Sequence, residues 1–388
     1  MTAAAAPGSR PAAQVPWYLI AVLLAATSTV VGVIWDISWH RTIGRDTFWT
    51  PAHMAIYLGG VLAGCACGFL VLRTTFAGTP EERAAGVRFW GFRGPLGAWV
   101  AIWGAFAMIT SAPFDNWWHN AYGLDVKVLS PPHVLLALGF TGIQLGALLM
   151  ALALQNRTAG PPPPALKWMF VYAAGLLVTN VTIMGFNQIA FANDMHNALY
   201  YQVAAFGVLL FLVAATRASR LAWPATATAV VYMAVTLAML WILQLFPATA
   251  RLAPIYRSIT HMVPPPFPML LVIPALGVDL ISRRLRGRVN DWVQALAVGV
   301  VFVAVLFAVQ WFLAPFLISP HSENFVFGTS RWDYSSRPGP WEHQFWNTED
   351  GILGGKSPVW WLPVTALLGM VAARIGLAWG NWMTRVKR

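Results

Sequence analysis

Residues 17–39 read WYLIAVLLAATSTVVGVIWDISW, an apolar run that begins and ends with tryptophan. A helix needs about 20 consecutive apolar residues to cross a hydrocarbon core of about 30 Å, so this run is long enough to span a membrane. Tryptophan is enriched at membrane–water interfaces, where its ring lies at the level of the headgroups. The run therefore predicts a transmembrane helix, and similar runs recur along the whole chain.

The composition of the 388 residues supports this prediction. Hydrophobic residues make up 58% of the chain and charged residues only 10%, whereas soluble domains carry about 25% charged residues. The formal net charge of +11 would suit nucleic-acid binding, but the Lys and Arg residues lie in short connections between apolar runs, as membrane topology requires. We therefore expect membrane lipid around the chain and no nucleic-acid partner.

The hydropathy pattern predicts an all-α fold, a polytopic transmembrane helical bundle of about ten spans. The predicted spans are residues 17–39, 51–73, 95–114, 132–155, 168–190, 196–216, 222–246, 265–282, 292–316 and 358–380. The Ala- and Pro-rich residues 1–15 are predicted to be a disordered tail. Residues 16–160 would form a helix bundle that carries the sites discussed below. Residues 161–388 would add further transmembrane helices and an outer loop over 317–357.

Basic residues are distributed unequally between the two sides of this predicted topology. About 17 of the 25 basic residues lie on the side that carries both termini, so the positive-inside rule places both termini in the cytoplasm. All eight histidines then fall on the opposite, outer side: His40, His53, His119, His133, His196, His261, His321 and His343. A functional site is therefore expected at the outer ends of the helices.

Two segments repeat the same polar residues at nearly the same spacing. Residues 35–53 read WDISWHRTIGRDTFWTPAH, and residues 114–133 read FDNWWHNAYGLDVKVLSPPH. Each copy has an Asp, a His four residues later, a Gly four residues after that His, a second Asp, and a Pro shortly before a second His. Repeated helix pairs are common in membrane proteins, and here the polar residues repeat as well as the hydropathy.

In the first copy, Asp36 and His40 lie on one helix face, because residues i and i+4 are neighbours on a helix. His53 begins the next helix at a similar depth, two residues after a proline that suits a first helical turn. Two imidazoles and one carboxylate form a ligand set that suits copper, zinc or iron, and the affinity order favours copper. The sequence therefore predicts two metal sites, with ligands Asp36, His40 and His53, and Asp115, His119 and His133.

A structural role for these residues is the alternative interpretation. Asp, His and Trp at helix ends can be interfacial anchors, and an Asp–His pair can cap or bridge helices. Ionisable groups at membrane depth are costly and therefore point to function, and two copies with nearly the same spacing favour the metal sites. The second Asp of each copy, Asp46 or Asp125, is interpreted as a loop or helix-cap residue.

At these residues the chain resembles the C-type membrane subunit of the copper membrane monooxygenases, the particulate methane and ammonia monooxygenase family. The stretch DISWHRTIGRDTFWTPAH, residues 36–53, resembles the first metal segment of that subunit, both in its ligands and in the residues between them. The DNWWH stretch, followed by PPH at residues 131–133, resembles the second metal segment. The resemblance covers about residues 30–150, and Asp115 stands where the family has Asn.

The resemblance implies copper at both sites and a monooxygenase reaction. Reduced copper would bind and activate O2, and a small apolar substrate that arrives through the lipid would be hydroxylated. Electrons would come from a quinol or an external carrier, and partner subunits of a monooxygenase complex are implied. The resemblance also implies a bacterial cytoplasmic membrane, with the metal sites near its outer face. The chain has more predicted spans than the C-type family members and lacks a cupredoxin-like domain, so we expect a divergent relative.

Two other functions use the same residues. A non-enzymatic protein could bind copper for storage or delivery, or transport a metal. A transporter needs polar residues through the bilayer, and transfer of soft Cu(I) favours Met- or Cys-rich relays, neither of which the sequence displays. A bis-His haem protein would need facing histidines with room for a porphyrin, and the Asp paired with each His argues against it.

Weaker candidates lie in the second half of the chain. Asp194 and His196 stand at an outer helix start, and His261 precedes the proline run 264–266. Each is a candidate for an added ligand or, at the helix start, a substrate-channel residue, whereas an ordinary capped helix start is the simpler interpretation. The outer loop over 317–357 is predicted to be an interfacial lid, with capping of the metal face or docking of a partner as alternatives.

Overall fold

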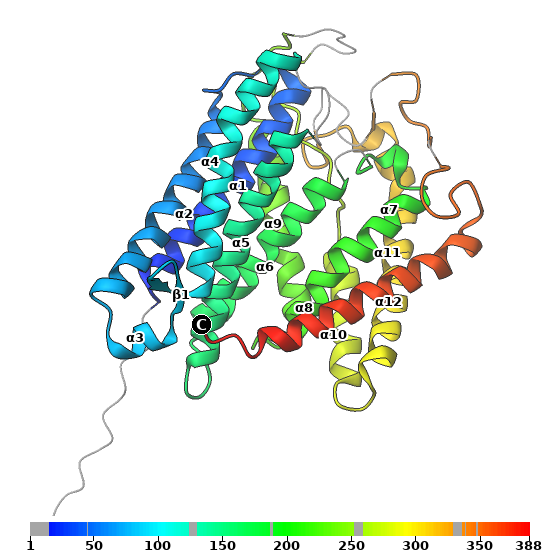
Figure 1. The fold of residues 1–388 in the computed structure, drawn as a ribbon. Coiled ribbons are helices and arrows are strands. Elements are labelled where there is room, and N and C mark those ends of the chain that lie inside the picture. Colours follow the sequence, from blue (N-terminus) through cyan, green and yellow to red (C-terminus); the bar gives the residue numbers. More distant parts are fainter. Residues whose placement is uncertain are drawn as a thin grey trace, which may run out of the picture.

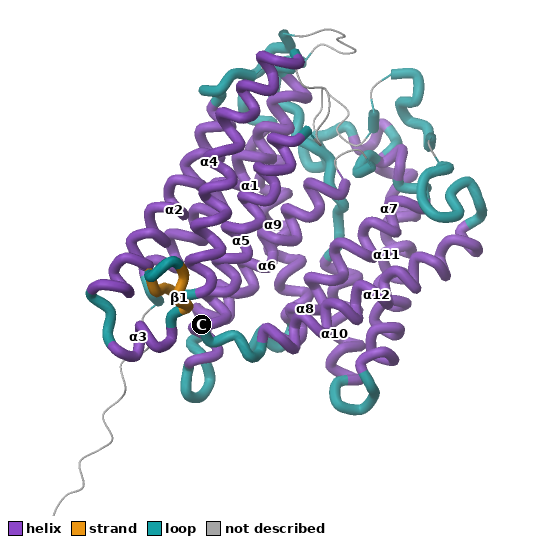
Figure 2. Tube along the Cα trace, viewed as in Figure 1, coloured by secondary structure: helices purple, strands orange, loops and turns teal. Residues whose placement is uncertain are grey.

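Nine helices in the described part of the chain are long and apolar enough to cross a membrane. The structure is a computed structural model that describes residues 15–44, 46–123, 130–186, 189–251, 259–328, 336–337, 339–346 and 348–388. The spanning helices are α1 (Trp17–Thr42), α2 (Pro51–Phe76), α4 (Leu96–Tyr122), α5 (Pro131–Arg157), α6 (Pro164–Phe186), the continuous run of α7 (Ala198–Val203), η2 (Ala204–Val208) and α8 (Leu209–Ala218), α9 (Pro224–Leu243), α11 (Asp291–Leu317) and α12 (Pro358–Met383). The prediction of a helical chain with long apolar helices that could span a membrane is confirmed (Figures 1 and 2). The predicted tail, residues 1–15, lies outside the described residues except for Val15.

Prolines set the starts of many of these helices. Five of the spanning helices begin with proline at their first residue: Pro51, Pro131, Pro164, Pro224 and Pro358. Proline suits this position because its fixed φ is already helical and its missing N–H would have no partner there. In both copies of the repeated motif, the second histidine therefore lies within the first turn of a helix.

The short elements lie in the connections. The helix α3 (Pro80–Ala85) begins with a capping box in which Thr79 and Glu82 bond each other's backbone N–H groups. It is followed by an antiparallel hairpin of β1 (Val87–Phe89) and β2 (Phe92–Gly94). Two short 3-10 turns, η1 (Ala192–Asp194) and η3 (Pro320–Ser322), lie at the opposite end of the bundle.

The predicted span over residues 265–282 does not form a full transmembrane helix. Helix α10 begins only at Val272 and ends at Leu285, because the preceding prolines remove backbone donors and disfavour helix. The extended segment before α10 packs inside the protein. Ser38 Oγ donates to Val263 O (2.7 Å), and Thr42 Oγ1 accepts from Val263 N (2.8 Å). Extended backbone is tolerated at membrane depth when protein groups satisfy it in this way.

Small residues bring the helices that carry the motif into close contact. A Cβ atom placed on Gly104 of α4 would lie 2.6 Å from the backbone O of Gly139 and 2.6 Å from the backbone N of Ile143, both on α5. On α2, a Cβ atom on Gly59 would lie 2.7 Å from the backbone O of Ala25 on α1. Backbone contact of this kind is the usual way in which membrane helices associate, because lipid provides no hydrophobic force between them.

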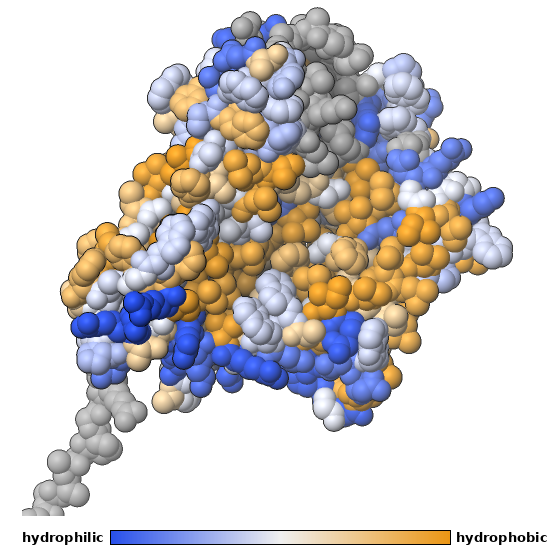
Figure 3. Space-filling model, in the orientation of Figure 1, coloured by the Kyte–Doolittle hydropathy of each residue, from blue (hydrophilic) through white to orange (hydrophobic). Residues whose placement is uncertain are grey.

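The surface and the ends of the bundle fit a membrane-embedded chain. Figure 3 shows a broad apolar band across the bundle and a strongly hydrophilic rim along its lower edge. The C-terminal end lies at this lower edge (Figure 1), where Asn156 Nδ2 donates to Met383 O (2.9 Å) and Val386 O (2.8 Å). The repeated motif lies at the opposite end, where α1 and α4 end and α2 and α5 begin.

The glycine contact between α4 and α5 gives a test of the fold. Gly104→Leu should destabilise the protein by about 1–3 kcal/mol or more, because the added side chain must push two backbones apart. Thermal unfolding of the detergent-solubilised protein measures this effect. Gly68→Leu on α2 is the control, since a Cβ atom there meets nothing within 4 Å. Equal unfolding temperatures of the two variants would contradict the close α4–α5 contact.

Candidate metal centre

Each copy of the motif turns the chain at a glycine with positive φ. The φ of Gly44 is +84° after α1, and that of Gly123 is +89° after α4. Glycine adopts this left-handed conformation without the steric cost that other residues meet. The backbone N–H of Gly123 also donates to the last turn of α4 at His119 O (2.9 Å). The turn ends the first helix just after its histidine and allows the chain to return with the second histidine at the same depth.

In the first copy, two carboxylates and two imidazoles converge. His53 Nε2 lies 3.1 Å from Asp36 Oδ1 and 3.3 Å from Asp46 Oδ2. His40 Nε2 lies 3.7 Å from Asp36 Oδ2 and 3.5 Å from Asp46 Oδ2. One ligand atom each from Asp36, Asp46 and His53 lies within 4.8 Å of the other two. The structure therefore brings together all three predicted ligands of the first site and adds Asp46.

The hydrogen bonding of His53 makes its inner nitrogen a metal-ligand candidate. His53 Nδ1 lies 2.9 Å from the carbonyl O of Thr47, which can only accept a hydrogen bond. Nδ1 must therefore carry a proton, and in the neutral ring Nε2 is then a lone-pair acceptor. Nε2 faces two carboxylates that are also acceptors, so the group needs a cation, either a second proton on the ring or a metal ion. Metal-bound histidines usually have their other nitrogen bonded in this way.

The second copy repeats the arrangement with one carboxylate. His119 Nε2 lies 3.3 Å from Asp115 Oδ2, and His133 Nε2 lies 3.5 Å from Asp115 Oδ1. His119 Nδ1 faces the carbonyl O of Gly123 at 3.3 Å. Asp115 Oδ1 is buried and has no hydrogen-bond donor among the described residues. The predicted counterpart of Asp46, Asp125, lies outside the described residues.

The two clusters line a single small cavity of about 60 Å³ between α1, α2, α4 and α5. All six predicted ligands contribute to its wall: Asp36, His40, His53, Asp115, His119 and His133. Tyr57 and Ser111, which the repeated motif does not include, also line it. In the first cluster, the separations of 3.1 and 3.3 Å between His53 Nε2 and the two carboxylates match ligand atoms that surround one ion, since bonds of about 2.0–2.2 Å place neighbouring ligands about 3.0–3.6 Å apart. The ligand atoms of Asp115, His119 and His133 do not all lie within 4.8 Å of one another, so the second cluster is the more open of the two. The residues present therefore fit bound metal.

Asp46 has a larger role than its interpretation as a loop or cap residue suggested. Its hydrogen bond with His40 lowers the pKa of the Asp46 carboxyl to about 2, against an opposing effect of burial. The carboxylate is therefore ionised at any physiological pH and available as a ligand. The sequence alone did not indicate this role, because Asp46 follows the end of α1 and only the turn at Gly44 returns it to the end of that helix.

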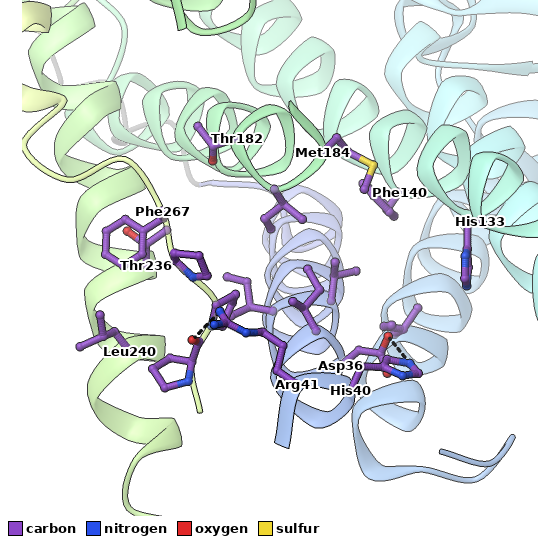
Figure 4. Close-up of a pocket in the computed structure, with 18 of the residues that line it drawn as sticks. Asp36, His40, Arg41, His133, Phe140, Thr182, Met184, Thr236, Leu240 and Phe267 are labelled. Atoms are coloured by element: carbon purple, nitrogen blue, oxygen red, sulfur yellow. Dashed lines mark hydrogen bonds and ion pairs between the residues drawn. The ribbon is translucent and has the colours of Figure 1, made fainter. Parts of the chain in front are cut away.

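A larger, mainly apolar cavity of about 400 Å³ lies beside the cluster. Asp36, His40 and His133 lie at one side of it, and Phe267 and Leu240 lie at the opposite side (Figure 4). The prolines of the extended segment before α10 form part of its wall: Pro264, Pro265 and Pro266. A cavity of this kind next to the candidate ligands can hold a small apolar molecule and exclude bulk water.

Arg41 forms part of the cavity wall and connects it to the outer loop. Its guanidinium donates to Pro264 O (3.0 Å) and lies over the ring of Phe191, 4.9 Å from the ring centre. Arg337 of the outer loop lies over the same Phe191 ring at 5.1 Å. Phe191 itself lines the cavity, so contacts of the outer loop extend to the cavity wall.

The weaker candidates Asp194, His196 and His261 do not line the small cavity. His196 is stacked between Trp311 and Phe345, with ring centres 3.8 and 3.7 Å away. Asp194 is buried and forms an ion pair with Arg337 (3.3 Å). His261 pairs through its backbone with Pro247, and its Nδ1 faces Thr260 Oγ1 at 2.9 Å.

The outer loop is fixed to the protein through the segment before α7. Asn193 Nδ2 donates to the carbonyls of Trp341 and Gln344, and Asn193 Oδ1 accepts from the backbone N of Arg337 (2.7 Å). In the same loop, His343 Nε2 lies 3.4 Å from Glu323 Oε1. These contacts hold the described part of the loop against the helix ends.

No family model matches the chain, and no curated protein or solved structure matches it either. The geometry of the two cavities is therefore the basis for the function proposed below.

The burial of Asp194 predicts a pH dependence of stability. Burial raises the pKa of Asp194 to about 6, against the opposing charge of Arg337. A carboxyl with a raised pKa binds more protons when folded, so its contribution to stability is lost as pH rises from about 4 to about 6, by about 1.4 kcal/mol per pH unit at most. Asp194→Asn should lack this component in thermal unfolding between about pH 4 and pH 7. Parallel pH profiles of the two proteins would refute the assignment.

Proposed function

We propose that the chain is a copper-binding integral membrane protein, a component or relative of a copper-dependent membrane monooxygenase that hydroxylates a small apolar substrate with O2. One observation carries this proposal. The two copies of the motif, far apart in sequence, meet in one small cavity that adjoins a larger apolar cavity. Paired imidazole–carboxylate clusters beside a site for an apolar molecule suit oxygen chemistry on that molecule.

The donor set favours copper over the other candidate metals. Each cluster offers two imidazoles with one or two carboxylates, and no described thiolate lines the cavity. Imidazole suits copper, zinc and iron, and for a given site of this kind copper binds most tightly among the divalent ions. Zinc and iron are the other metals that this donor set can bind.

The residues of the chain have separate roles in this proposal. Asp36, Asp46 and His53 would hold one ion, with His40 beside it, and Asp115, His119 and His133 would hold a second. Copper in such a site supplies the binding and activation of O2. The carbonyls of Thr47 and Gly123 fix the orientation of two of the imidazoles. The apolar cavity positions the substrate and excludes water.

The location we propose is a bacterial cytoplasmic membrane, with both termini on the cytoplasmic side and the metal cavity near the outer face. The basic connections between helices support this orientation, because positively charged loops are retained in the cytoplasm. A substrate would then enter from the lipid, and electrons would come from a quinol or an external carrier. Partner subunits of a monooxygenase complex belong to the same proposal.

A non-enzymatic protein that binds or delivers copper is the second candidate, because the metal clusters alone would serve it. The apolar cavity favours the enzyme, because copper storage or delivery does not require a binding site for an apolar molecule. The two cysteines do not offer a soft relay, since Cys65 lies at the exposed surface of α2 and Cys67 is buried in the core. Binding of copper without turnover of any apolar substrate would favour the second candidate.

Metal content tests the proposed ligands. His53→Ala and His133→Ala should each lose about one equivalent of copper, because each removes a ligand that donates from the cavity wall. Elemental mass spectrometry of the purified protein after copper loading measures the content, and circular dichroism verifies the fold. His321→Ala is the matched control, since His321 is exposed at the same end of the bundle and does not line the cavity. An unchanged copper content in both the His53→Ala and the His133→Ala variant would contradict the proposed sites.

The apolar cavity can be filled without a change at the ligands. Ile183→Trp should lower turnover of an apolar substrate by about tenfold or more by displacing it from the copper, while the copper content stays unchanged. Ile109→Trp, on the exposed face of α4, serves as the control. Equal turnover by the two variants would show that the substrate does not bind in the apolar cavity. The proposal of the copper ligands would be unaffected by that result.

A further inference from the structure

A further cavity, of about 200 Å³, lies at the end of the bundle opposite the candidate metal ligands. Its wall is formed by the end of α8, the connection to α9 and the end of α10: Thr216, Leu221, Ala222, Pro224, Asp279, Ser282, Arg283 and Arg286. None of these residues belongs to the metal clusters. The cavity therefore needs an explanation of its own.

Two arginines give this cavity a positive charge. Arg286 donates to the carbonyl O of Thr216 (2.8 Å), and the guanidinium of Arg283 lies 4.3 Å from the ring centre of Trp223. Neither forms an ion pair with a carboxylate of the described residues. The side chains of Arg283 and Arg286 are both exposed to solvent. Arg217 nearby is paired with Asp291 (2.8 Å), and partial burial of the guanidinium, followed by the charge of Arg217, lowers the pKa of Arg286. A bound anion would relieve this local excess of positive charge.

The acidic residue in the wall, Asp279, offsets only part of this charge, through its electrostatic interaction with Arg283. Asp279 is buried, and its two oxygens accept from Ala225 N (3.1 Å), Thr226 N (2.7 Å) and Thr226 Oγ1 (2.7 Å). It therefore caps the start of α9, where backbone N–H groups have no partners within the helix. With one carboxylate and two guanidinium groups, the wall keeps a net positive charge.

One buried hydroxyl in the wall has no partner among the described residues. Ser282 is 5% exposed, and its Oγ atom forms no hydrogen bond to any of them. A buried hydroxyl without a partner costs free energy, so the position suggests a missing acceptor. Ser282 lies one residue before Arg283 and lines the same cavity. The hydroxyl and the two guanidinium groups form a donor set that suits the oxygens of a phosphate group.

We propose that this cavity binds a phosphate group through Arg283, Arg286 and Ser282. The surroundings are those of a membrane interface, because Trp223 is 40% exposed beside the cavity and Leu280 of α10 is 50% exposed. Basic pockets between membrane helices bind the headgroups of anionic lipids. The phosphate of an anionic phospholipid and free phosphate share the chemistry that the site recognises, and an experiment separates them.

The experiment measures thermal unfolding of the full-length protein in detergent with added phosphatidylglycerol, phosphatidylcholine or inorganic phosphate. Phosphatidylglycerol should stabilise the protein at lower concentrations than phosphatidylcholine. In the Arg283→Gln, Arg286→Gln double variant, the concentration needed should rise by about fivefold for each arginine removed. Stabilisation by inorganic phosphate at millimolar concentration would identify the phosphate group alone as sufficient, whereas an effect of the lipid only would identify the headgroup in the membrane.

Two further variants control for the loss of positive charge and for misfolding. Arg284→Gln with Arg288→Gln removes the same charge from two residues of the same segment that are exposed like Arg283 and Arg286 but do not line the cavity, and it should keep the lipid response. Ser282→Ala should weaken the response and leave the unbound protein folded, which covers the case in which the double arginine variant does not fold. The same loss in both arginine pairs, or no response to any phosphate compound, would overturn the proposal.

Discussion

The structure depends on the meeting of carboxylates and imidazoles at the ends of four helices. Asp36 and Asp115 each lie between two imidazole Nε2 atoms, and the outward nitrogen of His53 is already committed to a carbonyl. The Nε2 atom of neutral His53 and the carboxylate oxygens of Asp36 and Asp46, at 3.1 and 3.3 Å, are all acceptors and repel one another unless a cation lies between them. A protonated ring would satisfy one such contact, whereas a metal ion would satisfy all the contacts of one cluster together. The arrangement is therefore more readily explained by bound metal than by helix bridging.

Other features of the bundle follow from the need to hold these helix ends together. The glycines between α4 and α5 and between α1 and α2 allow backbone contact, which fixes the depth of each motif copy. The extended segment before α10 satisfies its backbone through Ser38 and Thr42 of α1 and leaves an apolar cavity beside the ligands. The outer loop reaches this cavity through Phe191, which lies against both Arg41 and Arg337. The cavity of the candidate metal ligands is thus surrounded by packed helices, apolar walls and a fixed loop.

The sequence predicted the spans and the six candidate ligands because both leave strong local signals. Apolar runs of helical length and a polar motif repeated at one spacing need no knowledge of distant contacts. The helix predicted over 265–282 was wrong in its first part, since hydropathy does not register the loss of backbone donors at the prolines before Val272. Asp46 was undervalued because its position depends on the φ of Gly44. The apolar cavity arises from contacts between helices far apart in sequence, and no local pattern encodes it.

X-ray absorption at the copper edge of the copper-loaded protein tests the central claim most directly, because it reports the ligand atoms themselves. We predict nitrogen and oxygen neighbours only, at about 2.0–2.2 Å, with the multiple-scattering signal of at least two imidazoles that is lost in a His53→Ala, His133→Ala double variant. Sulfur neighbours would place the copper on methionine or cysteine. An imidazole signal that persists unchanged in the double variant would place it on other histidines. Either result would contradict the metal centre proposed at the ends of these four helices.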